Sequence, residues 1–182
     1  TSNTYQQSSM RSPAAEAIDP YNRLWSRQNR FRLEAEQVRD NALAISGLYA
    51  NAVGGPSVYP YQPDGYYQDT YGGEGPGGEI LYPESSDENQ YRRGLYTMWR
   101  RSYLHPSMMA FDAPNREECT AERPLSNIPQ QALVLLNDPT YVEAARVLAE
   151  KVLRESASTD QERITFAFHH VLARNPSDQE LN

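Results

Sequence analysis

Apolar side chains recur at intervals of three, four and seven residues in the first third of the chain. This is the period of a helix that buries one face. Asp19 and Pro20 suit a helix start, and Gly47 suits a helix end. We therefore predict one long amphipathic helix that begins at Pro20. Its buried stripe would consist of Leu24, Phe31, Ala35, Val38, Ala42, Ile45 and Tyr49.

The last third of the chain predicts further helices. Pro129 to Asn137 is a short apolar segment, and Asp138 and Pro139 provide the N-cap and first position of the next helix. The buried stripe of that next helix would be Val142, Ala145, Leu148, Ala149 and Val152.

Two capping-box sequences follow, Thr159 with Glu162 and Ser177 with Glu180. The first would start a helix that packs through Ile164, Phe168, Val171 and Leu172. The second starts a helix just before the printed sequence stops. We therefore expect the chain to be a fragment of a longer polypeptide.

The middle of the chain lacks either period. Residues 53–90 hold eight of the ten glycines and many tyrosines, which predicts a long irregular loop. Aromatic residues are rare in disordered segments, so we expect this loop to be anchored by tyrosines. Alternation from Tyr91 to Tyr103 indicates a short strand, and Pro106 to Phe111 a brief helix. The expected anchors are Tyr59, Tyr61, Tyr66, Tyr67 and Tyr71.

These elements predict a mainly α fold with a long Gly/Pro/Tyr-rich loop and little β-strand. Residues 1–18 show no period and are interpreted as a lead-in or an upstream remnant. Residues 19–182 would form a single helical domain. The terminal helices would pack as antiparallel neighbours, with the helix from Pro20 lying on them.

Composition excludes several classes of partner. The net charge is -7 and the pI is about 5.0, which disfavours nucleic acid. No apolar run approaches the roughly 20 residues that span a membrane. The single cysteine, Cys119, excludes an internal disulfide and a four-cysteine zinc site, and we interpret it as a buried thiol. Of the 17 cationic residues only Lys151 is a lysine.

Arginines and aromatic residues gather after the loop and form the candidate binding cluster. An arginine beside an exposed aromatic ring can bind a sulfate, carboxylate or phosphate group on a sugar. Alternatively, these arginines tie the loop to the helices through carbonyls and carboxylates, as structural ion pairs do; Arg92 belongs to the same group. The candidate residues are Arg93, Tyr96, Trp99, Arg100, Arg101, His105, Asp112 and Arg123.

Other chemistries have weaker support. The loop tyrosines could stack on carbohydrate rings, although anchoring of the loop is favoured. The acidic run from Glu84 to Glu88 could bind calcium, but it lacks EF-hand spacing and better suits a solvated turn. His169 and His170 are adjacent and do not form a metal-binding pair on a helix. We find no nucleophile elbow and no phosphate loop, so no catalytic residue is assigned.

Several blocks of sequence together resemble a known family. In this order they are similar to the C-terminal part of domain of unknown function 1553, which is common in planctomycete exported proteins. The blocks are TYQQSS, DPYNRLWSRQNRFRLEAEQVRDNALAISG, GGPSVYPYQPDG, RRGLYTMWRRS, FDAPNREECT, PQQALVLLNDPTYVEAARVLAE and VLARNPSDQEL.

The resemblance implies an exported, periplasmic or cell-surface protein that is often linked to a c-type cytochrome domain. This chain has no CxxCH motif, so haem c would lie elsewhere in the parent polypeptide. The family usually has arginine where this chain has Gln6, Glu122 and Leu125, and the segment around Asn29 also differs. These departures would weaken any anion site that those arginines formed in other members.

We therefore expect a non-catalytic structural or interaction module whose partners are other domains or subunits of the parent protein. The alternative is a domain that binds or acts on polysaccharide and recognises anionic sugars through the arginine and aromatic cluster.

Overall fold

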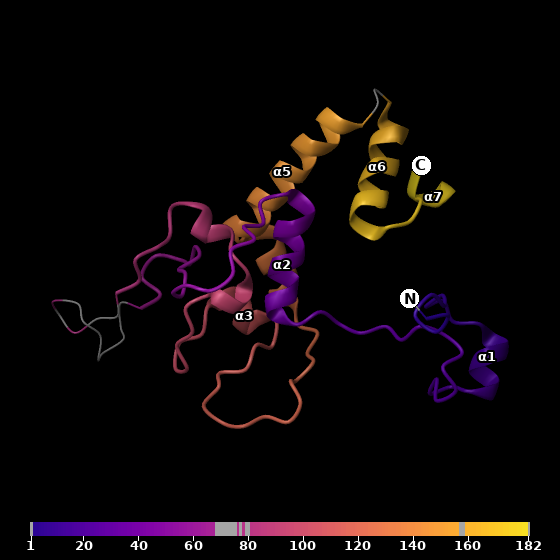
Figure 1. Ribbon diagram of the computed structural model, residues 1–182, viewed down its shortest axis with the longest axis horizontal. Coiled ribbons are helices and arrows are strands. Elements are labelled where there is room, and N and C mark those ends of the chain that lie inside the picture. The colour runs from indigo at the N-terminus through magenta and orange to yellow at the C-terminus, as the bar shows by residue number, and fades with distance from the viewer. Residues whose placement is uncertain (1, 68–75, 77, 79–80, 157–158, 182) are drawn as a thin grey trace. The chain divides into compact units, whose positions relative to one another are not determined.

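The computed structural model describes residues 2–67, 76, 78, 81–156 and 159–181 (Figure 1). The chain forms two compact units, residues 1–33 and residues 34–182. Within the described residues there are seven α-helices and no strand, which confirms the prediction of a mainly α fold.

The N-terminal unit contains one short helix, α1 (Pro13–Ile18), in a segment that sequence analysis interpreted as a lead-in. Proline at its start and three alanines favour this helix. Its apolar residues are largely uncovered, since Ile18 is 80% exposed.

The predicted helix from Pro20 is wrong, because the chain turns there instead. The Asp19 carboxylate accepts hydrogen bonds from the backbone N–H groups of Arg23 and Leu24, at 2.9 and 2.7 Å. Asn22 and Trp25 adopt positive φ angles of 52° and 57°, which no right-handed helix contains. Asp19 therefore caps a tight turn.

In the C-terminal unit, α2 (Ala35–Ser46) begins with a capping box between Glu34 and Gln37. It ends as predicted at Gly47, whose φ of 90° suits a residue without a side chain. The buried face of α2 shares Ala35 with the predicted stripe, but its later positions are shifted by one residue. It consists of Ala35, Arg39, Leu43 and Ser46.

Extended backbone after the loop does not form the predicted strand. Two 3₁₀ turns, η1 (Glu88–Tyr91) and η2 (Gly94–Tyr96), interrupt this stretch. Pairing is limited to two isolated bridges, between Ala50 and Arg92 and between Val58 and Thr97. The alternating residues therefore lie in and beside two 3₁₀ turns, and each turn is followed by a residue that forms one isolated bridge.

Tyrosines anchor the loop as predicted, where it is described. The Tyr66 hydroxyl donates to the carbonyl of Leu104 at 2.8 Å, and the Tyr67 hydroxyl donates to that of Tyr103 at 3.0 Å. The Tyr59 ring meets the ring of Tyr82 edge to face, with centroids 5.2 Å apart. Of the other two predicted anchors, Tyr61 is partly buried, and Tyr71 lies outside the described residues.

Helices α3 (Pro106–Ala110), α4 (Pro129–Asn137) and α5 (Pro139–Glu155) begin at the predicted prolines. Asp138 caps α5 as expected, since its side chain accepts from Thr140 N at 2.9 Å. α2 packs along α5, and α3 packs against both α2 and α4 (Figure 1). The core cluster joins Ala35, Leu104 and Met108, with Trp99, Phe111 and Ala113 against it.

Three predictions about burial are wrong. Val171 and Leu172, which were expected to pack in the helix after Thr159, are 38% and 53% exposed. α5 buries Tyr141 and Ala144 rather than Val142, which is 48% exposed, because α5 contacts α2 and α4 on a different side than the pattern suggested. Cys119 is exposed, since it lies in the irregular segment between α3 and α4.

α6 (Asp160–Leu172) begins with the predicted capping box of Thr159 and Glu162, and packs beside α5 (Figure 1). His170 on α6 bonds through Nε2 to the carbonyl of Ile45, at the end of α2, at 2.8 Å. The short helix α7 (Asp178–Leu181) follows. This bond ties α6 to α2.

Candidate functional site

Arg92 follows the loop in the sequence and binds the backbone at the start of that loop. Arg92 is 5% exposed, and its guanidinium donates to the carbonyls of Ala52, Gly54 and Pro56. It also lies over the Tyr96 ring, 4.2 Å from the centroid. The Tyr96 hydroxyl accepts from Gly54 N at 2.8 Å. Arg92 and Tyr96 are therefore committed to the same few residues of the loop.

Two other arginines of the cluster pair with α2. Arg93 Nε lies 3.6 Å from a carboxylate oxygen of Asp40. Arg123 donates to both carboxylate oxygens of Glu36, at 2.7 and 3.2 Å, and also lies 3.3 Å from Glu34. Burial raises the pKa of Glu36, but the hydrogen bond and charge of Arg123 outweigh it, so that the pKa is lowered. These pairs fix the flanking segments to α2.

The remaining candidates have different surroundings. Trp99 packs against the core cluster, and the guanidinium of Arg116 lies 3.8 Å from its ring centroid. Asp112 accepts from the backbone N–H and the hydroxyl of Ser126, at 2.8 and 2.7 Å. Arg100 is half-buried and Arg101 is exposed.

The described contacts thus divide the predicted cluster among the loop, α2, the core and Ser126. Arg123 pairs with Glu36, and Asp112 accepts from Ser126. The role of the cluster in binding anionic sugars stays a prediction.

His105 belongs to a second arrangement that the sequence did not reveal. It is the N-cap of α3 and is 3% exposed. Its Nε2 lies 2.7 Å from the carbonyl oxygen of Tyr61, and its Nδ1 lies 3.0 Å from Ser107 Oγ. Burial lowers the pKa of His105 to about 4, so the ring is neutral at pH 7.

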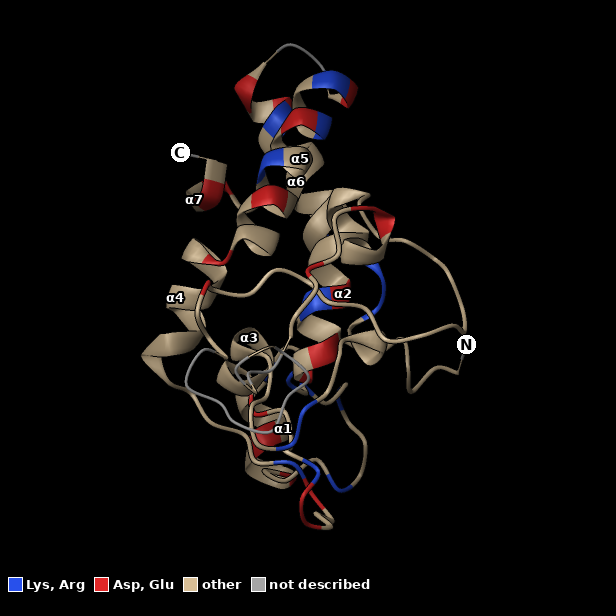
Figure 2. Ribbon diagram, turned by 90° about the vertical axis from the view of Figure 1, so that its left-hand side faces the viewer, with Lys and Arg blue, Asp and Glu red and all other residues tan. Residues whose placement is uncertain are grey.

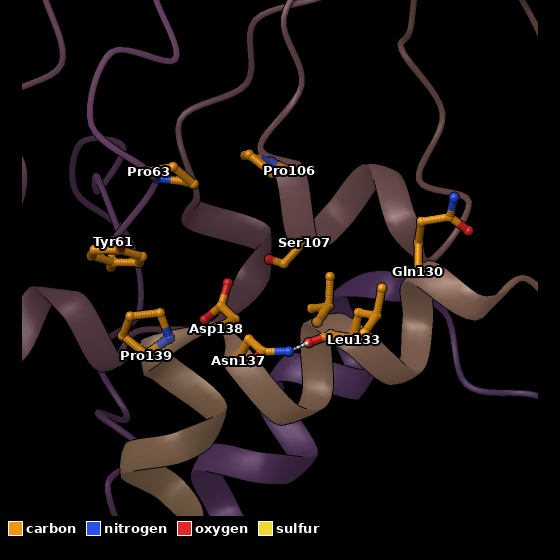
Figure 3. Close-up of a pocket in the computed structure, with 10 residues that line it drawn as sticks. Tyr61, Pro63, Pro106, Ser107, Gln130, Leu133, Asn137, Asp138 and Pro139 are labelled. Carbon is orange, nitrogen blue, oxygen red and sulfur yellow. Dashed lines mark hydrogen bonds between the residues drawn. The ribbon is translucent and has the colours of Figure 1, made fainter.

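Ser107 lines a pocket of about 370 Å³ in the C-terminal unit. Its walls come from four segments, namely the loop, the start of α3, one side of α4 and the α4–α5 junction (Figure 3). The lining is mostly apolar, with a few polar side chains. It consists of Tyr61, Pro63, Pro106, Ser107, Gln130, Leu133, Val134, Asn137, Asp138 and Pro139.

Asp138 supplies the carboxylate of this pocket, and one of its oxygens points towards Ser107 in Figure 3. Burial raises its pKa, although hydrogen bonds from Thr140 and the charge of Arg39 act against this. Arg39 is 2% exposed and donates to Thr140 Oγ1 at 3.3 Å and to the carbonyl of Gln90. A cation therefore stands near Asp138, but it is not among the residues that line the pocket.

A smaller pocket of about 220 Å³ shares Tyr61 and Pro139 with the first. It brings in the carboxylates of Glu84 and Glu143, and the latter accepts from the Tyr91 hydroxyl at 3.1 Å. Each pocket lining includes at least one acidic and one aromatic residue, and neither lining contains Lys or Arg among the described residues.

Sequence reasoning singled out His105 but missed its partners in this site. Ser107 carried no motif, Asp138 was recognised only as a helix cap, and Tyr61 only as a loop anchor. Ser107 lies two residues after His105, but Tyr61 and Asp138 are brought there by tertiary packing. No sequence signal of fixed spacing could have assembled these four residues.

Metal-binding and membrane-spanning features were searched over the part of the chain that the structure describes. No group of three or more His, Cys, Asp or Glu side chains there could hold a metal ion. In the acidic run, the Asp87 carboxylate accepts from Asn89 N at 3.0 Å and caps η1. None of the described helices has the length and apolar character needed to cross a membrane.

Comparison with known proteins identifies a family. No curated protein and no solved structure matches the chain. A family model described as PSD1, protein of unknown function (DUF1553), matches residues 1–182. With the match extending over the whole sequence, the chain belongs to the PSD1 (DUF1553) family.

Proposed function

We propose that this chain is a non-catalytic structural and interaction module of a larger exported, cytochrome-linked protein. The observation that carries the proposal is the inverted burial of α4. Its buried residue is the polar Gln131, whereas Leu133, Leu135 and Leu136 are 57%, 45% and 73% exposed. A helix that turns its leucines outward is suited to pack against another protein surface.

The N-terminal unit supports the same proposal. Its large apolar side chains are mostly uncovered, including Tyr21 at 80%, Leu24 at 74% and Phe31 at 78% exposure. Surface of this kind is stable in water when another domain covers it. We propose that the covering partners are other domains or subunits of the parent protein, a c-type cytochrome domain among them.

The α4 surface can be tested on the isolated chain by sedimentation. We expect concentration-dependent self-association, because the leucines that would meet a partner are free to meet each other. The double substitution Leu135→Ser and Leu136→Ser should reduce association and change the free energy of unfolding by less than about 1 kcal/mol. Val53→Ser, at an 84% exposed loop position, is the matched control. A chain that stays monomeric with a sharp unfolding transition would contradict the proposal.

The link to a cytochrome is tested separately on the parent protein isolated from its source. Its intact mass and visible spectrum should show a larger polypeptide or assembly with a haem band. A colourless protein of the size of this chain would remove the cytochrome-linked part of the proposal and leave the α4 test unaffected.

A further inference from the structure

The hydrogen bonds at His105 have a fixed direction, which determines what Ser107 presents to its pocket. The Tyr61 carbonyl can only accept, so the neutral ring must carry its proton on Nε2. Nδ1 is then an acceptor, and the Ser107 hydroxyl must donate to it across 3.0 Å. With its only proton engaged, Ser107 Oγ offers lone pairs alone to the pocket.

The second polar group facing the pocket is also an acceptor. Burial raises the pKa of Asp138, whereas the Thr140 hydrogen bonds and the charge of Arg39 favour its ionised form. In that form Asp138 accepts from Thr140 N and has no proton to donate. Figure 3 shows Asp138 and Ser107 directed towards one another, with the Tyr61 ring and three prolines around them. The pocket therefore combines two converging acceptors with an aromatic face and apolar walls.

We propose that this pocket, named here the Tyr61–Asp138 pocket, binds a primary ammonium group carried on an apolar body. The ammonium has three donors and a positive charge, which match the acceptors of Ser107 and Asp138. The apolar body would lie against Tyr61 and the proline rings, where a cation is also attracted by an aromatic face. This inference is independent of the proposed function, because it uses neither the leucines of α4 that the sedimentation test replaces nor the N-terminal unit.

Charge favours a cationic ligand over an anionic one. Residues 34–182 contain 12 basic and 22 acidic residues, a net charge of −10. The adjoining smaller pocket adds Glu84 and Glu143. Arg39 lies near Asp138 but does not line the pocket. Its guanidinium donates to Thr140 and Gln90, so it offers no group to a ligand in the pocket.

Size and lining restrict the ligand further. A pocket of about 370 Å³ lies at the lower end of the range for small-molecule sites, so it suits a ring or short chain with one charged head. The mostly apolar lining offers too few oxygens for a calcium ion, which takes six to eight oxygen ligands. A quaternary ammonium has no N–H to give to Ser107 or Asp138, and we expect it to bind more weakly.

Titration calorimetry on the full chain tests the proposal with phenethylamine as the probe. We expect saturable binding of one molecule per chain at pH 7. The neutral analogue 2-phenylethanol and the trimethylated ammonium should each bind at least about tenfold more weakly, since charge-assisted hydrogen bonds are lost. No saturable binding, or equal binding of the alcohol, would overturn the proposal.

Substitutions locate the site. Asp138→Asn removes the charge and keeps a good N-cap residue, so the fold is retained while affinity should fall about tenfold. Ser107→Ala should also weaken binding. Glu117→Gln makes the same change of charge at an exposed position outside the pocket and should bind like the wild type. Wild-type affinity in Asp138→Asn or in Ser107→Ala would overturn the two-acceptor site.

The ammonium group could belong to a free amine or to a lysine side chain of a partner. A short peptide with blocked ends and one central lysine distinguishes these sources. Binding of the peptide at least as tight as that of phenethylamine, and lost in Asp138→Asn, assigns the pocket to a lysine of a partner protein. Binding of phenethylamine alone assigns it to small amines.

Discussion

Buried polar residues, rather than a large apolar core, connect the loop of the C-terminal unit to its helices. Arg39, Arg92 and His105 are each at most 5% exposed, and each bonds to backbone carbonyls of a distant segment. A buried polar group that loses its partner costs about 1–3 kcal/mol, more for a charged group. These side chains therefore specify where the loop lies as strongly as apolar contacts do.

His105 should make stability depend on pH between 4 and 6.5. Burial lowers its pKa to about 4 from the ordinary 6.5, so between these values the unfolded chain takes up a proton that the folded chain excludes. Stability is fully present above pH 6.5 and falls as pH approaches 4. The contribution of this one group is about 3 kcal/mol.

Chemical denaturation at several pH values measures this dependence. His105→Asn should be less stable than the wild type at pH 7 and should lose less stability on acidification. His169→Asn, at an exposed position on α6, is the matched control and should retain the wild-type slope. An unchanged slope in His105→Asn would show that other groups cause the acid sensitivity.

At the scale of elements, the most reliable sequence signals were local ones at helix starts. Proline at the first helical position located the starts of α3, α4 and α5, and the box of Thr159 and Glu162 located α6. These signals work because they satisfy or remove the free N–H groups of a helix start.

The N-cap and proline signal at Asp19 and Pro20 predicted a helix that does not form. The Asp19 carboxylate instead accepts backbone hydrogen bonds within a turn, and the positive φ angles of Asn22 and Trp25 are incompatible with a helix. The strand prediction for Tyr91 to Tyr103 was wrong for a different reason. Alternation of apolar and polar residues cannot show whether a partner strand of sufficient length exists. Such outcomes depend on tertiary contacts that periodicity does not contain.

Gly94 fixes how closely η2 approaches α2. A Cβ at this position would lie 3.0 Å from Glu36 Cα and 3.1 Å from Met108 Cε. Because one of these neighbours is helix backbone, Gly94→Ala must push the two elements apart, and we expect a loss of about 1–3 kcal/mol in the free energy of unfolding. Leu95→Ala, at a neighbouring 58% exposed position, should cost less than about 1 kcal/mol. Equal stability of both variants in denaturant titrations would contradict this close packing.

At the scale of the whole molecule, charge is distributed unevenly along the sequence. Residues 1–33 carry five arginines and two acidic residues, whereas residues 34–182 carry a net −10. Figure 2 shows acidic and basic residues mixed along α5, where Arg146 and Arg154 both pair with Glu150. This mixing leaves α5 without a single-sign basic face, which would attract an anionic polymer.

The polysaccharide alternative and our proposal predict different stabilities for Trp99→Ala. If Trp99 were an exposed platform for sugars, its removal would not lower the free energy of unfolding. Trp99 instead packs against the core cluster beneath Arg116, so we expect Trp99→Ala to lower the free energy of unfolding by about 2–4 kcal/mol.

Thermal unfolding and retention on a heparin column measure the two outcomes on the same samples. Arg101→Ala, at an exposed position of the same segment, is the control for loss of charge without loss of packing. We expect weak retention of the wild type and of Arg101→Ala at physiological salt, since the positive groups of Arg92, Arg93 and Arg123 are engaged internally. Strong retention that Trp99→Ala abolishes at unchanged stability would instead assign the cluster to anionic sugars.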